Sequence, residues 1–131
     1  MIVRIPDPLN WWRIGEANKL LEPARARGGF ATCVEPDEAL FCVFEGQEML
    51  AAATAWLSTD KFVEVKLVGG RDRHRWLDEL DARIGAEAAA AGATRLVAIG
   101  RRGWSRELAR LGWETVQPVD NHWLFERKLG D

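Results

Sequence analysis

The residues from position 71 to position 75 gather the side chains of this chain that are best suited to bind an anion. Their order is Arg71, Asp72, Arg73, His74 and Arg75. Guanidinium groups bind phosphate through paired hydrogen bonds, and several of them in one turn raise the local positive potential. Asp72 adds a carboxylate to the same turn. We therefore predict a phosphate-binding turn whose positive charge is partly offset.

The cysteines and histidines of the chain do not indicate a disulfide framework, a reactive thiol or a metal site. Cys33 and Cys42 are too few for a disulfide framework, and Cys42 lies in an apolar run typical of a buried strand. No histidine stands near Cys33 in the sequence to activate its thiol. His74 and His122 lack carboxylate or thiol companions at the spacing of metal ligands, so we expect no metal site.

A strand and a long helix are expected on either side of the arginine-rich turn. Residues 62–68 alternate polar and apolar side chains, which predicts a strand that Gly69-Gly70 ends. Asp72 is placed to cap the following helix, and Gly92 to end it. The apolar stripe of this helix consists of Trp76, Leu77, Leu80, Ile84 and Ala88.

The rest of the chain predicts one helix before this strand and further strands on both sides. Asn10 is placed to cap an N-terminal helix that Pro23 ends, and residues 24–29 follow either as a loop or as a short second helix. The residues between the first two strands include Gly46, which predicts a hairpin. Apolar runs predict strands at 39–44, 49–57, 95–99, 113–117 and 122–129, and a short helix at 105–111.

This order of elements predicts a single α/β (α+β) domain over residues 1–131. A strand before and a strand after the long helix indicate a parallel pair joined by a right-handed crossover. The flanking hairpins add antiparallel strands. The expected fold is therefore a mixed, mostly antiparallel sheet with a central parallel pair and helices on both faces.

The same order resembles the GCN5-related N-acetyltransferase (GNAT) family. The motifs that carry the resemblance are residues 65–77, a strand-to-helix passage, and Leu108-Ala109-Arg110-Leu111-Gly112-Trp113-Glu114, a helix that leads into the penultimate strand. Two further segments, Val68-Gly69-Gly70-Arg71 and Gly100-Arg101-Arg102-Gly103-Trp104, are similar to small GNAT-like proteins encoded by tailed bacteriophages.

The resemblance implies that acetyl-CoA binds at the strand-to-helix passage. There the strand exposes backbone groups to the pantetheine arm, and the helix N-terminus faces the pyrophosphate. Arg71 matches the first position of the family's phosphate motif, but His74 and Trp76 stand where the family has small residues that let phosphate approach. The implied coenzyme-binding residues are Leu67, Val68, Gly69, Gly70, Arg71, Arg73, His74, Arg75 and Trp76.

The resemblance also implies two catalytic positions. The family protonates the departing thiolate with a tyrosine, and this chain contains none. Ser105 stands near that place, as a weak donor or simply as the N-cap of its helix. Glu64 interrupts an apolar strand and is the candidate general base for the acceptor amine. Alternatively, Glu64 and Lys66 form the polar side of a partly exposed strand.

Two functions follow from the resemblance. One is acyl-CoA-dependent N-acyltransfer, with an acetyl group passing to an amine of a small molecule or protein. The alternative is a non-catalytic GNAT-fold phage accessory or virion protein that acts through protein contacts, with a phage protein or a second copy as partner. The expected location is the cytoplasm, or the virion in the second case.

Net charge and aromatic placement argue against two other partner classes. The formal net charge of −2 predicts no general affinity for nucleic acid or an anionic bilayer. The segment 101–104 is either a phosphate-binding basic pair beside a tryptophan or a turn with solvated arginines. Trp11 and Trp12 point about 100° apart on a helix, so one is expected to pack inward and the other to face a partner. Membrane insertion is not expected, because no basic face accompanies them.

Overall fold

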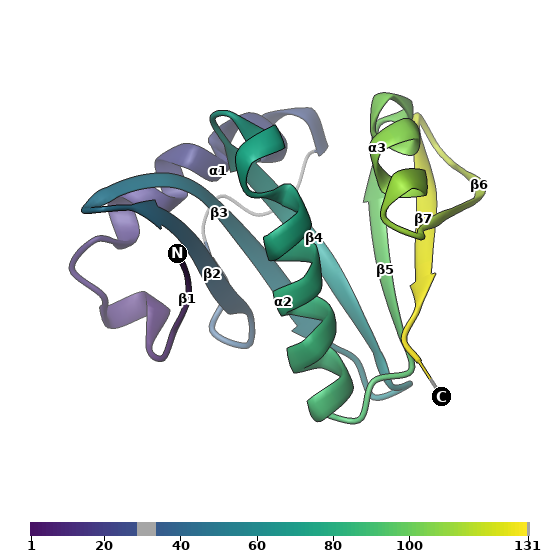
Figure 1. Ribbon diagram of the computed structural model, residues 1–131, viewed down its shortest axis with the longest axis horizontal. Coiled ribbons are helices and arrows are strands. Elements are labelled where there is room, and N and C mark those ends of the chain that lie inside the picture. The colour runs from purple at the N-terminus through teal and green to yellow at the C-terminus, as the bar shows by residue number, and fades with distance from the viewer. Residues whose placement is uncertain (29–33, 131) are drawn as a thin grey trace. The chain divides into compact units, whose positions relative to one another are not determined.

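The computed structural model describes residues 1–28 and 34–130 (Figure 1). Its strands are ordered β1-β2-β3-β4-β5-β7-β6 in one sheet, in which β4 and β5 are parallel and the β1–β2, β2–β3, β5–β7 and β6–β7 pairs are antiparallel. The expected mixed sheet with a parallel pair is thus confirmed. The strands are β1 (Ile2–Ile5), β2 (Ala39–Glu45), β3 (Glu48–Leu57), β4 (Phe62–Gly70), β5 (Arg95–Gly100), β6 (Glu114–Val119) and β7 (His122–Lys128). The α-helices of the described residues are α1 (Ile14–Gly28), α2 (Leu77–Ala90) and α3 (Ser105–Arg110).

The chain forms two compact units, and both β4 and α2 contribute to each of them. The first unit contains residues 1–56 and 66–80, and the second contains residues 57–65 and 81–131. In the described part of the chain, no helix has the length and apolarity needed to cross a membrane.

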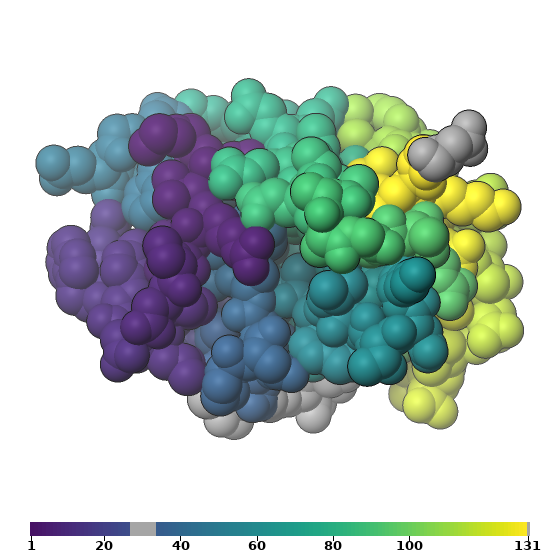
Figure 2. Space-filling view, turned by 90° about the horizontal axis from the view of Figure 1, so that it is seen from below, coloured from purple at the N-terminus to yellow at the C-terminus, as the bar shows by residue number. Residues whose placement is uncertain are grey.

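The first unit is built on the expected β2–β3 hairpin. Gly46 lies in its tight turn with a φ of 62°, a backbone conformation that favours glycine. Consecutive residues of both strands are buried, which confirms that both faces of this hairpin are covered. The strand β1 pairs with β2 at the edge of the sheet. The N-terminal segment that contains β1, purple in Figure 2, lies at the molecular surface.

The helix α1 differs from its prediction at both ends. It begins at Ile14 rather than after Asn10, because residues 8–10 form a 3₁₀ turn. The side-chain amide of Asn10 donates to the carboxylate of Asp7, just before this turn, at 3.0 Å. It also continues through Pro23 to Gly28, so residues 24–28 are helical and Gly29 lies outside the described residues. An internal proline costs a helix about 3 kcal/mol. Burial of Leu21 and Arg25 on either side of Pro23 shows that packing offsets this cost.

Trp11 and Trp12 take the two different environments that were expected. Trp11 packs against the core of the first unit and meets the Phe44 ring edge to face, with centroids 6.4 Å apart. Trp12 is 85% exposed. One indole therefore stabilises the first unit, and the other is available to solvent.

The strand β4 and the helix α2 also differ from prediction where they meet. Gly69 and Gly70 end β4 as its last two residues, so the strand is two residues longer than predicted, and α2 begins only at Leu77, after a 3₁₀ turn at Arg73–Arg75. Asp72 precedes that turn but makes no capping hydrogen bond through its side chain. The predicted apolar stripe is confirmed, since Trp76, Leu77, Leu80, Ile84 and Ala88 are all buried. Gly92, with a φ of 90°, follows the end of α2 as expected.

In the second unit, Asp81 of α2 joins the helix to the C-terminal strands. Its carboxylate accepts a hydrogen bond from the indole of buried Trp113 at 2.8 Å and lies 3.5 Å from the Arg127 guanidinium. Phe125 at the centre of β7 is 1% exposed. The short helix α3 begins with Ser105 itself, and its cap position, Trp104, makes no side-chain capping bond. The N-cap role proposed for Ser105 is therefore wrong.

Cys42 provides a first testable consequence of burial. Its side chain is fully buried in β2, as predicted, and burial raises the pKa of its thiol to about 12 from an ordinary value of 9.0. At pH values above the ordinary pKa of 9.0, the Cys42 thiol loses its proton in the unfolded chain and retains it in the folded chain. The contribution of Cys42 to the free energy of unfolding should therefore fall as pH rises from about 9, by at most about 1.4 kcal/mol per pH unit.

The measurement is the free energy of unfolding in urea at several pH values above 8, for the wild type and for Cys42→Ala. The wild type should lose stability with pH more steeply than the variant. Equal slopes would contradict a buried, protonated Cys42. Since the chain has no tyrosine, no phenol titrates in the same range. Cys33 lies outside the described residues.

Candidate functional site

The end of β4 packs so tightly that its two glycines have no room for a side chain. A Cβ built on Gly69 would overlap the backbone carbonyl of Leu20 in α1, and one on Gly70 would overlap the backbone of Leu50 and Ala51 in β3. The Arg71 amide then donates to the Leu50 carbonyl at 2.9 Å. These contacts fix the direction in which the chain leaves the sheet and enters the arginine-rich turn.

The turn itself uses some of the backbone donors that the resemblance assigns to phosphate. Asp72 adopts a left-handed conformation, with φ 54° and ψ 49°. The Arg75 amide donates to the Asp72 carbonyl at 2.9 Å, and the Trp76 amide donates to the Arg73 carbonyl at 3.2 Å. These two amides are therefore engaged within the turn, which leaves the arginine side chains as the main anion-binding groups.

His74 and Trp76, the two departures from the family motif, lie in different environments. Trp76 is 3% exposed, and its indole N–H donates to the Arg71 carbonyl at 2.6 Å. His74 is exposed. Trp76 therefore stabilises the turn from inside.

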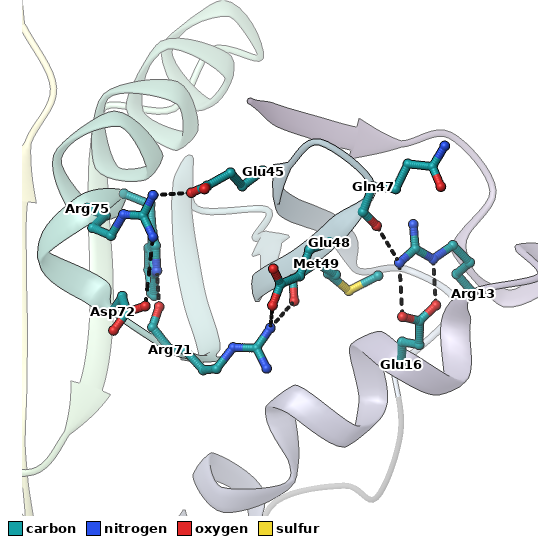
Figure 3. Close-up of polar contacts among 10 residues, drawn as sticks. Arg13, Glu16, Glu45, Gln47, Glu48, Met49, Arg71, Asp72 and Arg75 are labelled. Carbon is teal, nitrogen blue, oxygen red and sulfur yellow. Dashed lines mark hydrogen bonds and ion pairs between the residues drawn. The ribbon is translucent and has the colours of Figure 1, made fainter.

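Carboxylates from the β2–β3 hairpin hold two of the arginines (Figure 3). Arg71 forms an ion pair with Glu48 at 2.6 Å and also donates to the Met49 carbonyl at 3.3 Å. Arg75 forms an ion pair with Glu45, and its guanidinium lies 3.9 Å from the Asp72 carboxylate. All four residues of the two hairpin pairs are roughly half exposed, so solvent and competing anions can reach them.

No sequence pattern indicates that these carboxylates pair with the arginines. Glu45 and Glu48 belong to a segment that reads only as a polar hairpin turn, and they lie 30 and 23 residues before their arginines. Arg13 was not predicted as a contact of the hairpin either, because its partner Gln47 is also distant in the sequence.

Arg13 fixes the other side of the same hairpin turn. It donates to the Gln47 carbonyl at 3.0 Å (Figure 3). Its guanidinium also lies over the Phe44 ring, 5.2 Å from the centroid. It also hydrogen-bonds Glu16, which raises the pKa of Arg13 and lowers the pKa of Glu16. The hairpin turn is thus held by Arg13, just before α1, on one side and by the arginine-rich turn on the other.

Solved structures with the same arrangement of elements identify the fold. An aminoglycoside 6'-N-acetyltransferase complexed with coenzyme A superimposes with a TM-score of 0.81 at 11% identity, over 100% of this chain and 98% of that one. An IAA acetyltransferase from Bacillus cereus gives a TM-score of 0.72 at 12% identity, over 98% and 99% of the two chains. Tetrahymena GCN5 gives 0.66 at 8% identity, over 89% and 86%.

The chain has the GNAT fold. No protein-family model and no curated protein matches the sequence itself. At these identities the likeness concerns the fold, and the chemistry has to be argued from the residues.

The residues implied by the GNAT resemblance fall into both units. The proposed coenzyme-binding segment, residues 67–76, lies in the first unit. Glu64 and Ser105 lie in the second, where Glu64 is half-buried on β4 opposite Val97 of β5 and Ser105 is half-buried at the start of α3. The glycines, arginines and Trp76 are close neighbours in sequence, and the coenzyme-binding role of their segment, like the roles of Glu64 and Ser105, stays a prediction.

The segment 101–104 forms a turn in this GNAT fold. Residues 102–104 make a single 3₁₀ turn, and Arg101 and Arg102 are exposed. In residues 1–28 and 34–130, no group of three or more histidine, cysteine or acidic side chains is placed to hold a metal ion.

Proposed function

We propose that this chain is an acyl-CoA-dependent N-acyltransferase that transfers an acetyl group to an amine, with residues 1–131 acting as one GNAT-type domain. One observation carries the proposal. In a GNAT fold, the turn between β4 and α2 presents the exposed side chains of Arg71, Arg73, His74 and Arg75. The similarity to a structure that contains coenzyme A supports the choice of coenzyme.

The residues present fit an anionic coenzyme. Arg71, Arg73 and Arg75 would hold its phosphates, with His74 beside them. Backbone groups of β4 from Leu67 to Gly70 would meet the pantetheine arm. The coenzyme, when bound, supplies an acyl thioester to the site.

Two polar residues of the second unit are assigned to proton transfer. We assign to Glu64 the removal of a proton from the acceptor amine, because a half-buried carboxylate on the strand that leads to the coenzyme segment is a suitable base. We assign to Ser105 a hydroxyl that donates toward the departing sulfur. Since its side chain is not at the cap position of α3, it is not committed to a capping bond.

The test is calorimetry with acetyl-CoA followed by an acetylation assay on a panel of amines. We expect micromolar binding by the wild type, and in Glu64→Gln a kcat lower by about 100-fold or more with little change in coenzyme affinity, because a general base contributes on the order of 10²–10⁴ in rate. Glu114→Gln, an exposed carboxylate on β6, is the matched control. No binding at millimolar acetyl-CoA would contradict the proposal.

A second function is favoured by the ion pairs of the hairpin. Because Glu48 and Glu45 already neutralise Arg71 and Arg75, the fold is also suited to a non-catalytic role as a phage accessory or virion protein. The exposed indole of Trp12 would then contact a protein partner. Such a chain would bind no acetyl-CoA, and replacement of Trp12 with alanine would weaken its association with that partner.

A further inference from the structure

In the first unit, a buried carboxylate and an indole both lie near one ammonium group. The Glu38 side chain, just before β2, is only 3% exposed, and one of its oxygens lies 3.9 Å from the Lys66 ammonium. The same ammonium lies over the ring of Trp56 in β3, 5.6 Å from its centroid. We refer to Glu38 and Trp56 as the amine site.

The amine site offers a cation closer contacts than those that Lys66 makes with it. One Glu38 oxygen accepts the Glu35 amide at 2.6 Å, while the other faces Lys66 at a distance too long for a hydrogen bond. Buried carboxylates need closely placed partners to offset their loss of hydration. Cations within about 6 Å of an indole face are also attracted to it. Lys66 is 34% exposed, so solvent reaches the place where its ammonium lies.

We propose that the amine site recognises a protonated amine of the acceptor, and that Lys66 fills this place when no acceptor is bound. The proposal rests on the proposed function. Lys66 directly precedes Leu67, the first residue of the proposed coenzyme-binding segment, on β4.

The chemistry of the amine site also specifies the acceptor class. A carboxylate and an indole face both favour the charged form of an amine. An amine that attacks a thioester must be neutral. The bound ammonium is therefore not the reacting group, and the acceptor carries at least two amino groups.

The first experiment follows binding without any coenzyme. In the Lys66→Ala chain, 1,4-diaminobutane should shift the indole N–H signal of Trp56 in NMR spectra in a saturable way. The shift should require a concentration at least about tenfold higher in Lys66→Ala with Glu38→Gln, because a bond to a buried charge contributes about 1.5–3 kcal/mol. Lys19→Ala, which removes an exposed lysine of α1, is the control and should bind as weakly as the wild type. Absence of a saturable shift in Lys66→Ala would overturn the proposal.

A thermal melt distinguishes a variant that has lost binding from a variant that is unfolded. Lys66→Ala leaves Glu38 without its cation, so its melting temperature should fall and should recover on addition of 1,4-diaminobutane. A melting temperature that does not respond to the diamine would also count against the site. Trp56→Leu combined with Lys66→Ala should reduce the same recovery, because the indole face is then missing.

The second experiment compares acetylation of 1,4-diaminobutane and 1-aminobutane by the whole chain. The diamine should have the lower KM, and Glu38→Gln should abolish its advantage, whereas Lys19→Ala should preserve it. Equal KM values for the two amines in the wild type would overturn the acceptor class. If neither amine is acetylated, the proposed function fails, and the diamine shift in Lys66→Ala still decides whether the amine site exists.

Discussion

Replacement of Gly69 with alanine should destabilise the chain by about 3 kcal/mol or more. The added methyl group would overlap the backbone carbonyl of Leu20, and a backbone atom cannot turn away as a side chain can. Gly70→Ala should be at least as damaging, since its methyl group would overlap Leu50 and Ala51 at a φ of 156°. Thermal melts should show a fall of roughly 10 °C for either variant.

The matched control is Gly15→Ala in α1. A Cβ at Gly15 meets nothing within 4 Å, so alanine should leave the stability unchanged or raise it by up to about 1 kcal/mol. Wild-type stability of Gly69→Ala would mean that α1 does not lie against the end of β4. The comparison therefore tests the packing that directs the chain into the arginine-rich turn.

Removal of Arg71 and Arg75 together should weaken acetyl-CoA binding by about 30-fold or more. Each guanidinium is expected to hold a phosphate, and a hydrogen bond to a charged group contributes about 1.5–3 kcal/mol. The reciprocal variants Glu45→Gln and Glu48→Gln release the same arginines from their ion pairs. Each should strengthen binding by about two- to fivefold, the range expected for exposed pairs. Calorimetry on all four chains gives these affinities.

The control for charge alone is Arg101→Ala with Arg102→Ala. Both side chains are exposed arginines on the turn after β5, so the net charge changes equally while the β4–α2 turn is intact. Acetyl-CoA affinity should change by less than about threefold, since exposed charges act weakly through solvent. Equal losses in the two double variants would mean that the coenzyme senses overall charge and not this turn. If removal of Arg71 and Arg75 left the acetyl-CoA affinity unchanged, the coenzyme would bind elsewhere.

Local patterns sufficed for the elements that form this fold. The turn at Gly46 between two apolar runs predicted the β2–β3 hairpin, and the stripe from Trp76 to Ala88 predicted the buried face of α2. The arginine-rich turn was also visible, because its charges are adjacent in sequence. Each of these features depends on neighbours within a few residues, which periodicity and turn chemistry report directly.

Errors arose where a local preference met packing from distant residues. Pro23 normally ends a helix, but α1 continues because Leu21 and Arg25 are buried on both sides of it. Gly69 and Gly70 do end β4, but only the structure shows that α1 and β3 lie too close to them for any side chain. At Pro23 the free energy of packing exceeded the local preference.

The amino-acid sequence by itself determined the order of the elements, the buried faces of α2 and of the hairpin, and the concentration of arginines after β4. Only the tertiary structure decided which carboxylates neutralise those arginines and that Glu38, Trp56 and Lys66 meet. The physical reason is distance along the chain. Ion pairs and aromatic contacts act over a few ångströms, so residues far apart in sequence interact only after strand pairing has brought them together.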